Sequence, residues 1–209
     1  DVQNVLTRSQ EEIDSLDNIL TVQTLLYYLR TFYEGTSRRD LYEKWNDELE
    51  EIALKVSLLR QYAPEHLHEL TIEKAIVLGD EPPEPYSEQS NDNWKERIDD
   101  IDKRMLIRSL STAVQEHIDG VEWSTIIKGG LEAVRTLGEI PVIKETFKNA
   151  AKEKLQKRWV TLVDEELHAC DEYLLHIPGK RVLTQIIDRL ITANQQSMQL
   201  PEGMIFREF

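Results

Sequence analysis

The chain of 209 residues contains one cysteine, Cys170, so no disulfide can form within it. Glycosylation sequons of the Asn-x-Ser/Thr type are absent as well. Disulfides are typical of secreted proteins, and their absence favours a cytoplasmic or nuclear location. Long apolar runs are also missing: Ile76-Val77-Leu78 is far shorter than the roughly 18 residues of a membrane-spanning helix. The sequence therefore predicts a soluble protein without a membrane span.

Glycine and proline are scarce, with 8 and 7 residues, which excludes collagen-like and low-complexity chains. Acidic residues are in excess: the sequence has 39 Asp and Glu residues and 25 Lys and Arg residues, which gives a net charge of −14. Residues 1–100 carry 23 acidic and 10 basic side chains, whereas the remaining residues are nearly neutral. Because this acidic half repels phosphate backbones, we expect no nucleic-acid partner.

Apolar residues recur with the period of an α-helix, and the alternating pattern of β-strands joined by tight turns is absent. The fold is therefore predicted to be all-α, an irregular bundle of six or seven helices. The expected helical segments are 9–34, 38–62, 64–78, 94–119, 121–137 and 141–176, and a final helix carries the apolar positions from 182 to 191. In the long segment 141–176 the apolar positions change side, which predicts either a break near residues 152–158 or contact with different neighbours at its two ends.

Residues 79–92 contain three prolines and five acids with almost nothing to bury, which is typical of a linker. We therefore expect an N-terminal acidic helical half at 1–78, a C-terminal helical half at 93–200 and a tail at 201–209. One domain overall is the alternative.

Two Glu-x-x-His pairs have the spacing that places a carboxylate and an imidazole on one helix face in di-iron bundles, and a short aspartate run has the form of a magnesium-binding element. The residues concerned are Glu65, His68, Glu165, His168, Asp99 and Asp100. Both patterns lack the further inward acids that complete such sites. We therefore expect surface residues and no metal or other cofactor, and a metal-dependent helical enzyme remains the alternative function.

Three groups of residues are candidates for binding a partner: acids opposite the apolar stripe of segment 38–62, a lysine ridge, and apolar residues of the tail. The acids are Glu43, Asp47, Glu50 and Glu51, the lysine ridge consists of Lys144, Lys148 and Lys152, and the tail residues are Phe206 and Phe209. The tail is expected either to dock on the bundle or to bind another chain.

No nucleophile elbow and no phosphate-binding loop occurs, and Cys170 lies on an apolar stripe. The leading hypothesis is a non-catalytic adaptor, assembly or regulatory module that binds another protein or itself. From Val22 onward, segment 9–34 is apolar around most of its circumference, which predicts that this half of the helix is central. Its aromatic residues Tyr27, Tyr28, Phe32 and Tyr33 suggest a second alternative, a small-molecule sensor in which they line a cavity.

Overall fold

The computed structural model describes residues 18–87, 94–117, 120–140, 147 and 149–209. Across these ranges the regular secondary structure is entirely α-helical, which confirms the predicted all-α fold. None of the described helices is long and apolar enough to cross a membrane. The chain divides into two compact units, which we call unit 1 (Asp1–Asn91) and unit 2 (Asp92–Phe209).

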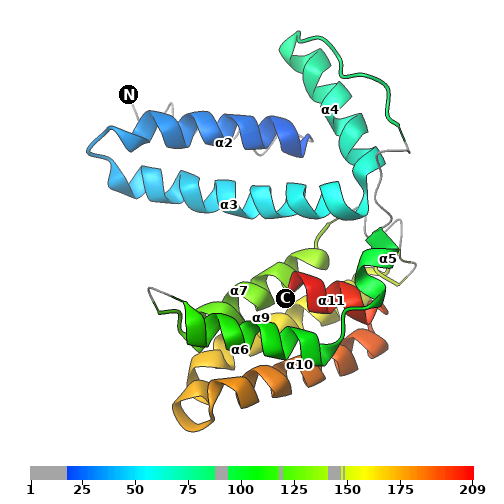
Figure 1. Ribbon diagram of the computed structural model, residues 1–209. Coiled ribbons are helices and arrows are strands. Elements are labelled where there is room, and N and C mark those ends of the chain that lie inside the picture. Colours follow the sequence, from blue (N-terminus) through cyan, green and yellow to red (C-terminus); the bar gives the residue numbers. More distant parts are fainter. Residues whose placement is uncertain (1–17, 88–93, 118–119, 141–146, 148) are drawn as a thin grey trace. The chain divides into compact units, whose positions relative to one another are not determined.

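Unit 1 is built on an antiparallel pair of helices, α2 (Ile19–Glu34) and α3 (Arg39–Tyr62), followed by α4 (Pro64–Leu78) (Figure 1). The Asn18 side chain begins α2 by accepting hydrogen bonds from the amides of Leu20 and Thr21. The same side chain donates to the carbonyl oxygen of Leu70 over 2.8 Å, which ties α2 to α4. The predicted start at residue 9 lies outside the described residues.

The core of unit 1 lies between α2 and α3, where Leu26 and Trp45 are almost fully buried. The stripe predicted for α3 supplies the other side of this contact through partly buried residues such as Leu41 and Leu49. Pro64 begins α4, where its missing amide costs no helical hydrogen bond, and Gly79 ends it in the left-handed region at φ 74°.

Unit 2 contains six described helices, so the described residues hold nine helices in all rather than six or seven. They are α5 (Trp94–Asp99), α6 (Lys103–Glu116), α7 (Trp123–Leu137), α9 (Glu153–His176), α10 (Gly179–Gln196) and α11 (Glu202–Glu208). Two differences explain the larger number. The predicted segment 94–119 is split because Asp102 caps a new helix by accepting the amide of Met105, and most of the predicted tail is helical.

Within the segment predicted at 141–176, helix α9 begins at Glu153, and Asn149 to Ala151 form a turn before it. Residues 141–146 and 148 lie outside the described residues. Helix α9 packs on α7 and α10, and Trp159, fully buried, donates its indole N–H to the Val134 carbonyl oxygen over 2.9 Å. The apolar stripe predicted around Trp159, Val163 and Cys170 therefore faces the core of unit 2.

The last residues of the chain dock on this core. Helix α11 contacts α5, α6 and α7, and Met204 and Ile205 are fully buried. Phe206 and Phe209 are buried as well, and the Phe209 ring lies directly against Gly130 in α7. The Gly129-Gly130 pair therefore sits within a continuous helix, where Gly130 permits a close approach.

Candidate functional site

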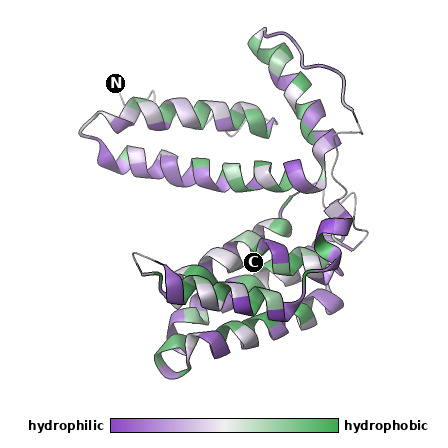
Figure 2. Ribbon diagram, in the orientation of Figure 1, coloured by the Kyte–Doolittle hydropathy of each residue, from purple (hydrophilic) through white to green (hydrophobic). Residues whose placement is uncertain are grey.

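The exposed apolar side chains are concentrated in unit 1. Among the described residues, seven of the nine large apolar side chains that are exposed belong to this unit: Leu25, Tyr27, Tyr28, Phe32, Ile76, Val77 and Leu78. The last three form the end of α4, which is coloured as hydrophobic in Figure 2. Exposed apolar side chains grouped on a folded domain are typical of a binding site, and the described residues of the two units differ in how many such side chains they leave exposed.

Helix α2 carries the largest part of this surface. At 100° per residue, Leu25, Tyr28 and Phe32 fall within about 60° of arc. We call these three residues the α2 apolar face. The Tyr28 and Phe32 side chains are 64% and 69% exposed, whereas Leu26 on the core side of the same helix is buried. Two sides of one helix are therefore apolar, and only one of them is covered by α3.

The aromatic residues suggested as a cavity lining do not share one enclosed site. Tyr27, Tyr28 and Phe32 are exposed, and only Tyr33 is buried, in the core between α2 and α3. The rings contact one another edge to face: Tyr27 and Tyr28 have centroids 5.9 Å apart, and Phe32 and Tyr33 are 5.0 Å apart.

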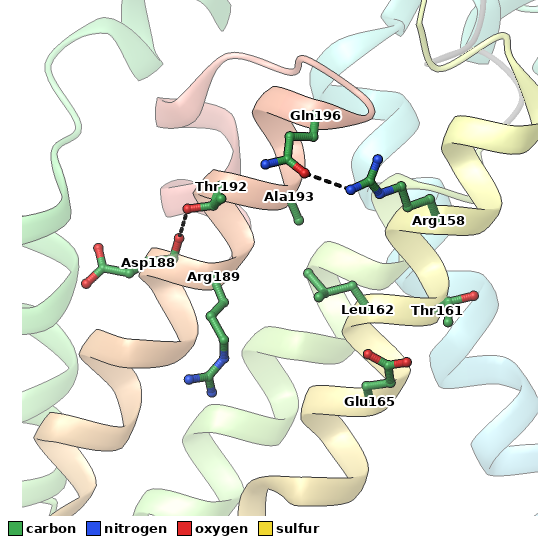
Figure 3. A pocket seen from close by; sticks show the side chains of 9 residues that line it. All are labelled: Arg158, Thr161, Leu162, Glu165, Asp188, Arg189, Thr192, Ala193 and Gln196. Carbon is green, nitrogen blue, oxygen red and sulfur yellow. Dashed lines mark hydrogen bonds between the residues drawn. The ribbon is translucent and has the colours of Figure 1, made fainter.

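A concave surface of about 570 Å³ lies between α9 and α10 in unit 2 (Figure 3). Leu162 and Ala193 give it an apolar part, and the Arg158 guanidinium donates to the Gln196 amide oxygen across it over 2.7 Å. The Asp188 carboxylate points away from the groove in Figure 3 and is paired with Lys103 of α6 instead.

Beside this groove lies a charged pair that the sequence analysis missed. Arg189 donates to both carboxylate oxygens of Glu166, with 2.6 Å between Nη2 and Oε2, while its guanidinium lies 5.2 Å from the Tyr173 ring centroid. The Glu166 side chain is only 6% exposed. The hydrogen bonds to Glu166 raise the pKa of Arg189 further above its usual range. Arg189 therefore stays charged, and the pair joins α9 to α10.

The metal-ligand candidates are spread over the molecule. The pair Glu65/His68 belongs to unit 1, and Glu165/His168 belongs to unit 2. His68 lies against the ring of Tyr86, whereas the Nδ1 atom of His168 lies 2.6 Å from the Asp164 carbonyl oxygen of its own helix. Asp99 and Asp100 are exposed at the end of α5. No group of three or more metal-binding side chains gathers among the residues that the structure describes.

The partner-binding candidates are placed as follows. All four acidic candidates are exposed on α3, namely Glu43, Asp47, Glu50 and Glu51. Glu43 forms an ion pair with Arg39. Lys152 is exposed just before α9, and Lys144 and Lys148 lie outside the described residues.

Phe206 and Phe209 are packed inside unit 2. The tail was expected either to dock on the bundle or to bind another chain, and in the structure it docks on the bundle.

Cys170, the remaining candidate for nucleophilic chemistry, is fully buried. Burial raises the pKa of its thiol, which favours the protonated and unreactive form. Its place among core residues of α9 agrees with the interpretation of Cys170 as a small apolar residue.

No protein-family model matches the sequence, and neither a curated protein nor a solved structure is significantly similar to it.

Proposed function

We propose that the protein is a protein–protein interaction module and that its unit 1 binds a helix of another protein along the α2 apolar face. The observation that supports this is the exposure of Leu25, Tyr28 and Phe32 on one side of a helix whose other side already packs on α3. Aromatic side chains contribute strongly to binding because they bury large areas with few rotatable bonds.

The spacing of these residues favours a helix as the bound element. Leu25, Tyr28 and Phe32 are separated by three and four residues, which is the spacing of the a and d positions at a helix–helix seam. A partner helix with the same spacing would cover all three side chains at once.

The charge of unit 1 favours a basic partner. Residues 18–87 carry 13 acidic and 7 basic side chains. Four of these acids, Glu43, Asp47, Glu50 and Glu51, are exposed on α3. Such a surplus accelerates association with a basic protein and opposes association with a second copy of the same unit. We therefore take the partner to present a basic amphipathic helix.

The test uses a labelled peptide of about 18 residues, five helical turns, built from leucine on one side and lysine on the other. Fluorescence anisotropy is expected to show saturable binding to the full chain. Tyr28→Ser combined with Phe32→Ser is expected to weaken binding by about tenfold or more, since each ring contributes roughly 1 kcal/mol or more of buried apolar area.

Tyr27→Ser is the matched control. Tyr27 is 51% exposed but lies about 100° around the helix from Tyr28, so its replacement should change affinity by less than about twofold. Equal losses in Tyr27→Ser and in the double variant would contradict the proposal. So would binding that appears only after residues 1–17 are deleted, because the α2 apolar face would then be occupied by the chain itself.

A further inference from the structure

Unit 2 has a separate groove of about 500 Å³ between α6 and the first turn of α10. Its charged lining residues are all basic, namely Arg104, Arg108 and Lys180. Ser111, Thr112 and Gln115 add hydroxyl and amide groups, although the Ser111 hydroxyl already donates to the Ile107 carbonyl oxygen over 2.6 Å. A basic groove of this kind is unexpected on a chain with a net charge of −14.

The cations of this groove are only partly neutralised. Arg104 pairs with Asp102 over 3.0 Å, yet its side chain remains 92% exposed. Arg108 and Lys180 have no ion-pair partner among the described residues. The first turn of α10 contains no acid, so the partial positive charge of its amides adds to the field of Lys180. An anionic group entering this groove would therefore gain favourable interactions from α6 and from α10.

The length of the groove indicates more than one anionic group. Its α6 residues extend from Arg104 to Gln115, which corresponds to about 16 Å of helix. Arg104 and Arg108 are one turn apart, or about 6 Å between side chains. Alternate residues of an extended chain repeat at nearly the same spacing, about 6.6 Å, so acids at every second position could face both arginines.

The geometry points to a second binding function: the groove between α6 and α10, which we call the α6–α10 groove, takes an extended acidic peptide segment with carboxylates at alternate positions. This site is independent of the α2 apolar face, since it lies in the other unit and recognises the opposite charge. The carboxylates of the peptide would accept hydrogen bonds from Arg104, Arg108 and Lys180, and the intervening side chains would point to solvent.

The probe is a labelled peptide of about ten residues that alternates aspartate and serine, titrated with the full chain in about 50 mM salt. We expect saturable anisotropy that weakens several-fold in about 300 mM salt, because these charges are exposed and screened. Arg104→Gln combined with Arg108→Gln should weaken binding by about fivefold to tenfold. Circular dichroism should show an unchanged fold, since both side chains are exposed.

Lys154→Gln combined with Lys157→Gln is the matched control. It removes two exposed cations from α9 of the same unit and should leave the affinity within about twofold. Equal weakening in both double variants, or no saturable binding below about 1 mM, would overturn the inference. Equal competition by a single-stranded oligonucleotide would show a general polyanion site, and tenfold tighter binding of a phosphoserine peptide would replace the carboxylate ligand by a phosphorylated one.

Discussion

Alanine substitutions at two neighbouring glycines of α7, Gly129 and Gly130, test the packing of Phe209 against this helix. A Cβ atom at position 130 would lie 2.5 Å from Cδ1 of Phe209 and 2.6 Å from its backbone oxygen, well inside van der Waals contact. A Cβ atom at position 129 would meet nothing within 4 Å. We therefore expect Gly129→Ala and Gly130→Ala to change the free energy of unfolding in opposite directions.

The magnitudes follow from helix propensity and burial. Alanine is favoured over glycine in a helix interior by about 1 kcal/mol, and at position 129 this gain is unopposed. At position 130 the added methyl group must displace Phe209, a buried side chain whose burial contributes about 1.5–3 kcal/mol. After the propensity gain is subtracted, Gly130→Ala should destabilise unit 2 by about 0.5–2 kcal/mol, and the two variants should differ by roughly 1.5–3 kcal/mol.

Urea unfolding followed by circular dichroism measures the difference, and hydrogen exchange of residues 202–208 shows whether α11 loosens in Gly130→Ala alone. A chain that lacks Phe209 is the control, because it removes both the ring and the backbone oxygen that the methyl group would meet. In that chain Gly130→Ala should become stabilising. Equal destabilisation by the two alanine variants, or a destabilising Gly130→Ala in the shortened chain, would refute the packing argument.

Three further predictions concern polar contacts. Arg189→Met should destabilise unit 2 by about 3 kcal/mol in urea unfolding, because it leaves Glu166 buried without a partner, whereas Glu166→Met leaves a half-exposed cation and should cost clearly less. Hydrogen bonds from Lys128 and Ser124 lower the pKa of Asp171, so its contribution to stability is complete above the unfolded-state pKa near 4 and is lost as the pH falls through the lower pKa of the folded state. The urea midpoints of wild type and Asp171→Asn should therefore converge as the pH falls below about 4. Asn18→Ala should lower stability by about 1 kcal/mol and speed hydrogen exchange in the first turn of α2, whereas Asn18→Asp should keep the cap but lose the donor to the Leu70 carbonyl.

The helical fold could be predicted because periodicity reports directly on burial, and α3 shows this best. Its apolar residues recur along one side, and the structure places that side against α2. The boundary between α5 and α6 was harder to find. Ile98, Ile101 and Met105 continue the helical spacing across Asp102, so the pattern alone indicates one helix. The signal was the residue type: aspartate is a strong N-cap, and its carboxylate accepts the Met105 amide.

The candidate sites were predictable only in part. Glu166 occupies the same helical stripe as Trp159, Val163 and Cys170, and an acid on an apolar stripe indicates a buried partner of opposite charge. That signal was available, but the identity of Arg189 depends on how α9 meets α10. The apolar circumference of α2 was interpreted as burial on all sides. Sequence cannot separate burial within the chain from burial against another protein, because both require the same residues.

The contrast between the units has a physical basis that supports the proposed function. Unit 2 covers its core with six described helices, the last of which is α11, whereas the described part of unit 1 has only α2, α3 and α4. A small set of helices buries a smaller fraction of its apolar surface, so it gains less from folding alone. A partner helix on Leu25, Tyr28 and Phe32 would add burial that the described helices of unit 1 do not supply. Binding and stability of unit 1 would then be linked, since a partner at about 100 times its dissociation constant adds about 2.7 kcal/mol.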